Sequence, residues 1–245
     1  MAVWNPWRGC HRHSEGCRYC YIHKGDVKRG VDTNVIEKSP KFNAPIAVNK
    51  RGEYTMKSGQ LIYCCFSTDF LLEDADPWRE ECWRMMKLRP DLHFLFLTKR
   101  IERLSHCLPS DWGDGYENVT IGCTAETQAI AHERLSLFMH LPIRHRNIIL
   151  QPMLEEINIV PYLCGTELVL VGGEYDRNAR PFHYEWALSV REQCVQNGVA
   201  FRFRQCGSNF VQNGLLRKLS YGVLFKCARD FNLDYTPEGS SLFLE

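Results

Sequence analysis

Six short apolar runs recur between residues 61 and 206, and this rhythm restricts the possible folds more than any other feature of the sequence. Each run has the length of one strand, contains β-branched or aromatic residues and is nearly continuous in apolarity, which is typical of strands buried on both faces. The runs are LIYCCF (61–66), HFLFLT (93–98), NVTIGCT (118–124), NIILQP (147–152), ELVLVGG (167–173) and VAFRFR (199–204).

Helical patterns lie between several of these runs. Asp76-Pro77 predicts a helix start, because proline is favoured at the first helical position. Two apolar stripes have helical spacing: Ala131, Leu135, Phe138 and Met139 form one, and Trp186, Val190 and Cys194 form the other, which Asn197-Gly198 ends. Strands that alternate with helices indicate βαβ units and a parallel sheet. The sequence therefore predicts an α/β fold, namely a full or partial β/α (TIM-like) barrel, with a doubly wound open sheet as the alternative.

The chain is expected to form a single domain. Its 245 residues, 44% of them hydrophobic, suffice for one sizeable core, and no Pro/Gly/Ser-rich linker or internal repeat divides them. No apolar run is long enough to span a bilayer, and the N-terminus lacks the apolar stretch of a secretory signal. We expect an N-terminal cysteine-rich cluster loop (1–24), a hairpin insertion (44–60), the barrel (61–206) and a C-terminal extension (207–245).

Polar groups follow each apolar run at the point where the expected strand ends. In β/α barrels the carboxyl ends of the strands form the site, so side chains from these positions are expected to share one mouth. Arg100 is expected to lie instead on a solvated first helical turn. The candidates for binding substrate are Asp69, Lys99, Glu126, Arg204 and Gln205, and Gly172-Gly173-Glu174 follows a later strand of the same series.

Three cysteines, Cys10, Cys17 and Cys20, lie within eleven residues near the N-terminus, with Gly9 and Gly16 to let the backbone bend. Three thiolates can bind three irons of a [4Fe–4S] cluster and leave the fourth iron open to another ligand. The same thiols with a nearby histidine could instead form a structural zinc site. The other nine of the chain's 12 cysteines are expected mostly to be small core residues, because they lie in apolar runs or on apolar helix faces.

The segment Cys17-Arg-Tyr-Cys20 is similar to the end of the radical S-adenosylmethionine (SAM) signature, although six residues separate Cys10 from Cys17 where the usual signature has three. The chain as a whole resembles an uncharacterised phage-borne radical-SAM-like family, domain-of-unknown-function family 5131, of the phage Gp37/Gp68 kind. The segments that carry this resemblance are WNPWRGCHRHSEGCRYCY (4–21), FLFLTKR (94–100), NVTIGCTAET (118–127), and VGGE with ARPFHYEWALSVREQC and FRFRQCG (171–207).

This resemblance implies a β/α barrel, a [4Fe–4S] cluster on Cys10, Cys17 and Cys20, and SAM as the cofactor cleaved to a 5′-deoxyadenosyl radical. Tyr19 is expected to pack against the cluster or the adenine. Gly172, Gly173 and Glu174 are expected to contact SAM, although in the wider superfamily a motif of this type follows an early strand. A reductant such as flavodoxin or ferredoxin would supply the electron. The expected location is the cytoplasm of a bacterium or of a phage-infected host.

The charge distribution suggests the class of substrate. The net charge of +1 argues for no particular partner, but residues 8–29 carry six Lys or Arg against only Glu15 and Asp26. A basic rim around the mouth favours an anionic substrate, which we expect to be a nucleotide or a single-stranded nucleic acid. The competing hypothesis is a zinc-clipped barrel that binds nucleic acid or protein for a phage and has no enzymatic activity.

Overall fold

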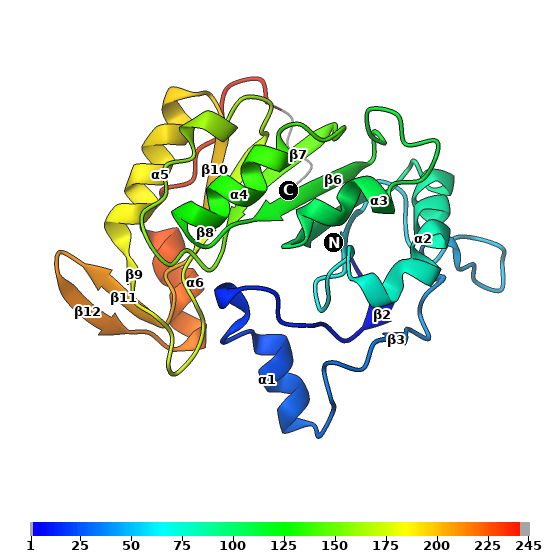
Figure 1. Ribbon diagram of the computed structural model, residues 1–245, viewed down its shortest axis with the longest axis horizontal. Coiled ribbons are helices and arrows are strands. Elements are labelled where there is room, and N and C mark those ends of the chain that lie inside the picture. The colour runs from blue at the N-terminus through cyan, green and yellow to red at the C-terminus, as the bar shows by residue number, and fades with distance from the viewer. Residues whose placement is uncertain (1, 241–245) are drawn as a thin grey trace.

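The computed structural model describes residues 2–240, and its centre is a parallel, seven-stranded sheet with strands in the order β1-β4-β5-β6-β7-β8-β10 (Figure 1). The strands are β1 (Ala2–Trp4), β4 (Leu61–Cys64), β5 (His93–Thr98), β6 (Val119–Thr124), β7 (His145–Leu150), β8 (Leu168–Gly172) and β10 (Ala200–Gln205). All six strands expected from the apolar runs are present. The sequence reasoning missed β1, because three residues are too few to show a periodicity; β1 pairs with β4 from Ala2 to Trp4.

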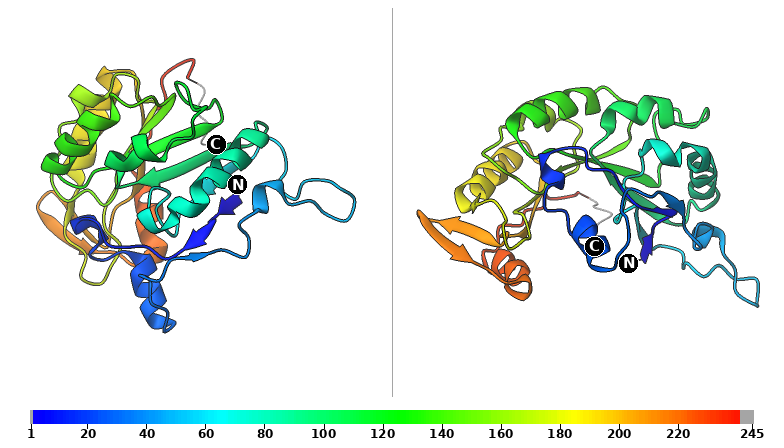
Figure 2. Two further views of the ribbon diagram at one scale, coloured as in Figure 1. Left: turned by 45° about the vertical axis from the view of Figure 1, so that its right-hand side comes forward. Right: turned by 60° about the horizontal axis from the view of Figure 1, so that its bottom comes forward.

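The helices that follow the strands cover the convex face of this curved sheet (Figure 2). They are α2 (Asp76–Leu88), α3 (Leu104–Cys107), α4 (Gln128–Phe138) and α5 (Tyr184–Gln196). Pro77 lies in the first turn of α2, and the hydroxyl of Thr127 caps α4 by accepting a hydrogen bond from the backbone N–H of Ile130 at 3.3 Å. Because the strand order never reverses and these helices lie on one face, the doubly wound alternative is wrong.

Alternate side chains of the strands build the core between sheet and helices. Phe96 of β5 packs against Phe70 and against Trp83 of α2, with ring centroids 4.6 Å and 6.0 Å apart. The opposite face of the sheet is concave. There Gly122 of β6 lies between Leu97 and Ile149, and a Cβ at Gly122 would approach a Leu97 methyl to 2.5 Å. The sheet is therefore buried on its convex face and partly open on its concave one.

The sheet remains a half-barrel because residues after α6 cover the outer edge of β10. Phe201 and Tyr235 form an antiparallel bridge with hydrogen bonds of 2.9 Å and 3.0 Å. The backbone N–H of Phe203 donates to Asp234 Oδ1 at 2.9 Å. Because these edge groups are already bonded, β10 cannot pair with β1. The partial barrel is thus the form of the prediction that the structure supports.

Smaller elements surround the half-barrel. They are α1 (Tyr21–Lys28), α6 (Tyr221–Asp230), the pair β2 (Trp7–Arg8) and β3 (Glu37–Lys38), the three-stranded sheet of β9 (Phe182–His183), β11 (Asn209–Gln212) and β12 (Leu215–Lys218), and the 3₁₀ turns η1 (Glu15–Cys17), η2 (Ala44–Ile46), η3 (Glu73–Ala75), η4 (Ile101–Arg103) and η5 (Val160–Tyr162). Residues 44–60, expected as a hairpin, contain η2 and a single antiparallel bridge between Val48 and Tyr54. None of the helices described between residues 2 and 240 is long and apolar enough to cross a membrane.

Candidate functional site

The carboxyl ends of the strands face residues 9–20, which we call the cysteine segment. This segment lies across the open end of the half-barrel (Figure 2). The local sequence allows the path. Gly9 has φ +90°, and a Cβ there would come within 2.4 Å of the carbonyl oxygen of Val35, so only glycine fits. The next residue, Cys10, donates its backbone N–H to the carbonyl of Thr33 at 2.8 Å.

Asp69, which follows β4, forms the first contact between the strand ends and the cysteine segment. Its carboxylate accepts hydrogen bonds from the Thr98 hydroxyl at 2.8 Å, the Lys99 backbone N–H at 3.1 Å and Arg100 Nη1 at 3.1 Å. Arg100 Nη2 then donates to the carbonyl of His11 at 2.8 Å. Arg100 is only 7% exposed, so the expectation that it lies on a solvated turn is wrong. The Arg100 guanidinium therefore bonds both to the Asp69 carboxylate and to the backbone of His11, the residue after Cys10.

Glu126, which follows β6, forms the second contact. It is 1% exposed and accepts from Lys99 Nζ at 2.8 Å, from Arg134 Nη1 at 2.9 Å and from the Ser14 hydroxyl. A Cβ on Gly16 would lie 2.5 Å from the Glu126 side chain, so the glycine allows η1 to pack directly on this carboxylate. Burial alone would raise the pKa of Glu126, but the charges of Lys99 and Arg134 outweigh it and hold the pKa below its ordinary value.

Glu174, after β8, forms the third contact. The backbone N–H of Arg180 and its Nη2 donate to the buried carboxylate at 2.9 Å and 2.6 Å. Arg180 Nη2 also donates to the carbonyl of Glu15 at 2.9 Å. The bond with Glu174 raises the pKa of Arg180, so this cation is permanent at any physiological pH. The Arg180 guanidinium carbon lies 5.8 Å from the centre of the Tyr19 ring, at the edge of cation–π range.

The two glycines before Glu174 pack against protein backbone. A Cβ on Gly173 would come within 2.7 Å of Gly207 Cα and 2.8 Å of the Cys206 carbonyl oxygen. A Cβ on Gly172 would lie 3.0 Å from the Gln151 side chain and 3.1 Å from that of Gln205. In this structure the Gly-Gly pair therefore lets the ends of β8 and β10 approach each other.

The structure places the last two candidates for binding substrate, Gln205 and Arg204, in different surroundings. Gln205 is buried, and its Nε2 donates to the Gly173 carbonyl at 2.8 Å; its Oε1 is buried without a hydrogen-bond partner among the described residues. Arg204 is exposed and lies over the Phe225 ring of α6, 5.5 Å from its centre. Asp69, Lys99 and Glu126 are thus brought together with the cysteine segment, and Arg204 lies outside this group.

All three cysteines of the segment are free thiols. Cys17 is buried, and Cys10 and Cys20 are partly exposed. Burial raises the pKa of the Cys10 thiol to about 12, with a further contribution from Asp69, so this thiol is protonated at neutral pH. Within residues 2–240, no three His, Cys, Asp or Glu side chains are grouped closely enough to hold a metal ion. The assignment of these cysteines as cluster ligands therefore stays a prediction.

Sequence reasoning missed Ser14, Arg134 and Arg180, which complete the three contacts. Arg134 carried a detectable signal, because it lies on the buried face of α4 beside the stripe of Ala131 and Leu135, where a charge needs a partner. Ser14 carried none, since its partner lies 112 residues away, and the contact of Arg180 with Glu15 spans 165 residues.

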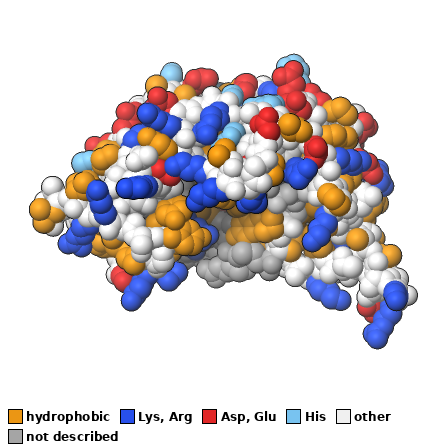
Figure 3. All heavy atoms as spheres, turned by 90° about the horizontal axis from the view of Figure 1, so that it is seen from below, with side chains coloured by type: hydrophobic (Ala, Val, Ile, Leu, Met, Phe, Trp, Pro, Cys, Tyr) orange, Lys and Arg blue, Asp and Glu red, His pale blue; other side chains and the backbone are white. Residues whose placement is uncertain are grey.

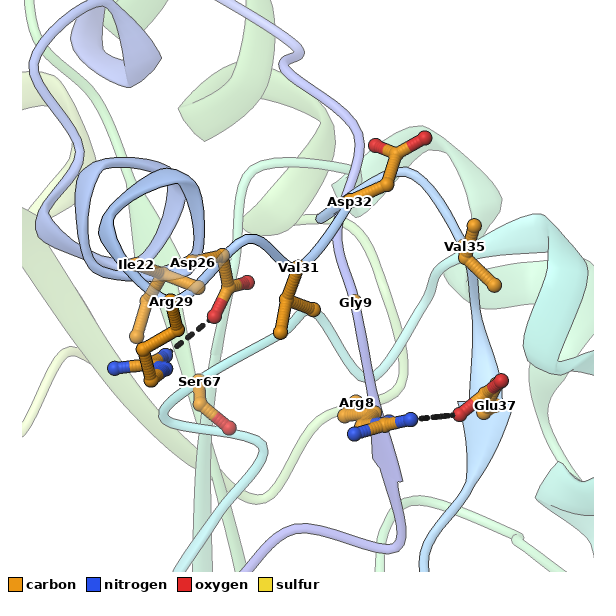
Figure 4. A pocket seen from close by; sticks show the side chains of 10 residues that line it. All are labelled: Arg8, Gly9, Ile22, Asp26, Arg29, Val31, Asp32, Val35, Glu37 and Ser67. Atoms are coloured by element: carbon orange, nitrogen blue, oxygen red, sulfur yellow. Dashed lines mark hydrogen bonds and ion pairs between the residues drawn. The ribbon is translucent and has the colours of Figure 1, made fainter.

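A cavity of about 390 Å³ adjoins the start of the cysteine segment (Figure 4). Two ion pairs line it, Arg8 with Glu37 and Arg29 with Asp26, and Gly9 and Ser67 form part of its wall. Asp32 adds a third carboxylate to these two pairs, so the lining carries one more acidic than basic group. It does not include the three strand-end carboxylates.

Comparison with known proteins gives one match. A family model described as "Protein of unknown function (DUF5131)" matches residues 1–228. No curated protein and no solved structure matches the chain.

Proposed function

The chain belongs to the DUF5131 family, whose description gives no function. From its residues, we propose that it is a radical SAM enzyme. In this proposal Cys10, Cys17 and Cys20 bind a [4Fe–4S] cluster with one open iron. The substrate is anionic, a nucleotide or a nucleic acid. The protein acts in the cytoplasm of a bacterium or an infected host and takes electrons from a flavodoxin or ferredoxin.

One observation carries the proposal: a segment with three free thiols is bound to the carboxyl ends of a parallel half-barrel by three strand-end carboxylates, two of them through arginines and one through a serine hydroxyl. Asp69 acts through Arg100, Glu126 through Ser14, and Glu174 through Arg180. Carboxyl ends of parallel strands are where α/β proteins place their reacting groups. These three contacts place the cysteine segment at the edge of the sheet where such groups are found.

The residues fit such a cluster in the number and kind of their donors, because three soft thiolates suit iron–sulfur ligation. When bound, the cluster would supply the electron that cleaves SAM to methionine and a 5′-deoxyadenosyl radical. Tyr19 is held beside Arg180, Arg18 and Lys24 and lies between Cys17 and Cys20 in the sequence. Its ring would pack against the cluster or the adenine, and the half-barrel would shield the radical from water.

The strand-end residues divide into two roles in this proposal. Asp69, Lys99 and Glu126 already have partners, so they act as positioning residues that hold the cysteine segment in place. Glu174, with Gly172 and Gly173, lies where the segment meets the end of β8, and it would bind the ammonium group of SAM in competition with Arg180. Gln205 Oε1 and the exposed Arg204 remain for the substrate.

Metal content tests the proposal directly. Anaerobic reconstitution with iron and sulfide should give about four irons per chain, and serine at Cys10, Cys17 or Cys20 should abolish this loading. Cys164→Ser is the matched control, since Cys164 is an exposed free thiol outside the segment, and it should load iron like the unmodified protein. Stoichiometric zinc that iron cannot replace would refute the cluster and favour the zinc-clipped binding module.

SAM cleavage tests the second half of the proposal. The reduced, reconstituted protein should release 5′-deoxyadenosine from SAM, even slowly and without substrate. Glu174→Gln should weaken SAM binding about ten- to a hundredfold, because it loses a charge-assisted hydrogen bond worth roughly 1.5–3 kcal/mol. Unchanged SAM binding in a variant that still loads iron would remove Glu174 from the cofactor site.

A further inference from the structure

Six aromatic side chains lie beside the cysteine segment, and we call this group the aromatic belt. The belt consists of Tyr63, Phe66, Tyr21, Tyr221, Tyr175 and Phe225, which come from β4 and the turn after it, the start of α1, the start of α6, and the loop after β8. Its members are far apart in the sequence, so only the fold brings them together.

Ring contacts connect the belt. Tyr63 and Phe66 have ring centroids 4.5 Å apart, and the hydroxyl of Tyr21 donates to the Phe66 carbonyl at 3.0 Å. Tyr221 lies 4.9 Å from Tyr175 and 5.4 Å from Phe225. The ion pair of Lys24, one turn after Tyr21, with Asp176, the neighbour of Tyr175, joins the two groups of rings. Because Tyr21 follows Cys20 directly, the belt runs past the end of the cysteine segment.

The middle of the belt is open to solvent. Tyr21 is 62% exposed, Tyr221 58% and Tyr175 43%, although rings of this size usually gain most by burial. A cluster of exposed aromatic rings with faces or edges free is typical of a binding surface. The described residues therefore cover these three tyrosines only in part.

A cation accompanies the belt. Arg204 is exposed and lies over the Phe225 ring, whereas Lys24, one turn after Tyr21, is paired with the buried Asp176. Seen from the side of α1, the molecule is hollowed, with hydrophobic side chains in the hollow and Lys and Arg side chains along its rim (Figure 3). Acidic side chains gather mainly toward the opposite, helix-covered side in the same view. The surface therefore combines stacking platforms with positive charge.

We propose that the aromatic belt binds single-stranded nucleic acid, with bases stacked on Tyr21, Tyr221 and Tyr175 and phosphates near Arg204. Aromatic rings interleaved with cations are the usual surface for an unpaired strand, because every base offers a flat face and every linkage a negative charge. A duplex hides its base faces and would leave the tyrosines without partners. The inference rests on the proposed function in one respect. It takes the bound strand to be the substrate of the enzyme, which would then lie beside Cys20.

Binding of labelled oligonucleotides tests the belt. Anisotropy with oligo(dT) or oligo(rU) of about 12 nucleotides should show binding at low salt, and an otherwise equal duplex should bind more weakly. Tyr221→Ala and Tyr21→Ala should each weaken binding of the single strand about five- to a hundredfold, the effect of losing one stacked base. Tyr54→Ala is the matched control, because Tyr54 is 44% exposed in the 44–60 region outside the belt, and it should bind as the unmodified protein does.

A charge variant separates stacking from phosphate contact. Arg204→Ala should weaken binding and make it less sensitive to salt, by about 0.7 in the slope of log affinity against log salt concentration for one phosphate. Arg84→Ala on α2, where Arg84 is also exposed, should leave both quantities unchanged. Thermal unfolding of each variant shows that it is folded.

Three results would overturn the inference: no binding of single strands at low salt, equal affinity for the duplex, or tyrosine variants that bind like the control. Iron content and 5′-deoxyadenosine release are measured on the same preparations. If these activities are present while oligonucleotides fail to bind, the belt proposal fails and the enzyme proposal stands. If oligonucleotides bind through the belt while no cluster forms, the enzyme proposal fails and the binding surface stands.

Discussion

At the scale of single residues, the three strand-end carboxylates are used as anchors. Asp69, Glu126 and Glu174 are each 5% exposed or less, and each has a cationic partner. A buried carboxylate is costly unless cations and hydrogen bonds compensate for its lost hydration. Arg100 and Arg180 also contact His11 and Glu15, and Glu126 itself contacts Ser14, so the compensation for burial and the placement of the cysteine segment depend on the same groups.

Glu126 offers a quantitative test of this anchoring. Glu126→Gln leaves Arg134 and Lys99 without a counter-charge in a buried setting, so the free energy of unfolding should fall by about 3–5 kcal/mol. The measurement is urea unfolding at neutral pH. Glu117→Gln is the control, since Glu117 is exposed and pairs with Arg144 at the surface, and it should cost less than about 1 kcal/mol. Equal effects of the two substitutions would mean that Glu126 is not an anchor.

Gly173 tests the close approach of two strand ends. Gly173→Ala places a methyl group 2.7–2.9 Å from the backbone of Cys206 and Gly207, which cannot move aside as a side chain can. We expect a loss of stability of about 1–3 kcal/mol, measured by thermal unfolding. Gly222→Ala in α6 is the control: nothing lies within 4 Å of its Cβ position, so the change should be neutral or stabilising by up to about 1 kcal/mol. A neutral Gly173→Ala would contradict the packing described here.

At the scale of elements, one buried arginine attaches residues 44–60 to the sheet. Arg89 is 1% exposed; it donates to the carbonyls of Pro45 and Met56 and, through two bonds of 2.8 Å, to both carboxylate oxygens of Asp91. Its guanidinium carbon also lies 4.0 Å from the centre of the Tyr54 ring. This region has only one bridge of its own, so its placement depends on these bonds.

Asp91 should make this attachment sensitive to acid. The hydrogen bond from Arg89, followed by that from Ser58, lowers the pKa of Asp91 from 3.8 to about 2. The unfolded chain therefore binds more protons than the folded one as pH falls from about 4 to 2, and stability decreases through that window. Asp91→Asn should lower stability by about 1 kcal/mol at pH 7, allowing for the carboxylate's partial exposure, and the difference should vanish near pH 2. The measurement is the urea midpoint of both proteins from pH 7 to about pH 2. A constant difference between them would refute the lowered pKa of Asp91 as the cause.

At the scale of the whole molecule, the half-barrel is stable as an open sheet because its last strand is covered. Asp234 and Tyr235 bond to the edge of β10, and Phe231 packs against Phe203 with ring centroids 6.4 Å apart. An uncovered edge beside aromatic side chains would pair with another chain. The concave face stays accessible from the side that carries α1 and α6.

Deletion of residues 233–245 should therefore expose the edge of β10 and cause self-association. We expect a concentration-dependent shift to larger species in size-exclusion chromatography, with faster aggregation on warming. Deletion of residues 241–245 alone is the control and leaves the bonds of Asp234 and Tyr235 in place. A monomeric, stable protein after the longer deletion would show that residues 234–235 are not needed to protect the edge of β10.

Local patterns allowed much of the fold to be predicted. The runs that became β5 and β6 are continuously apolar because both faces of each strand are covered, and Pro77 and Asn197 mark helix ends through their own backbone preferences. These signals depend on neighbours within a few residues, so the sequence alone determined the parallel α/β fold and the polar strand ends. It could not reveal the three-residue β1, which gains its structure only by pairing with β4.

Only the tertiary structure decided what the polar strand ends do. Arg100 looked like a surface residue, yet the fold places it against Asp69 and His11; Glu126 meets Ser14 and Arg180 meets Glu15 for the same reason. The sheet could have closed or stayed open with the same strands, and the bonds of Phe201 and Phe203 to residues 234–235 kept it open. The physical reason is that strand formation follows from local apolarity, whereas ion pairing and edge covering depend on distances between residues far apart in the chain.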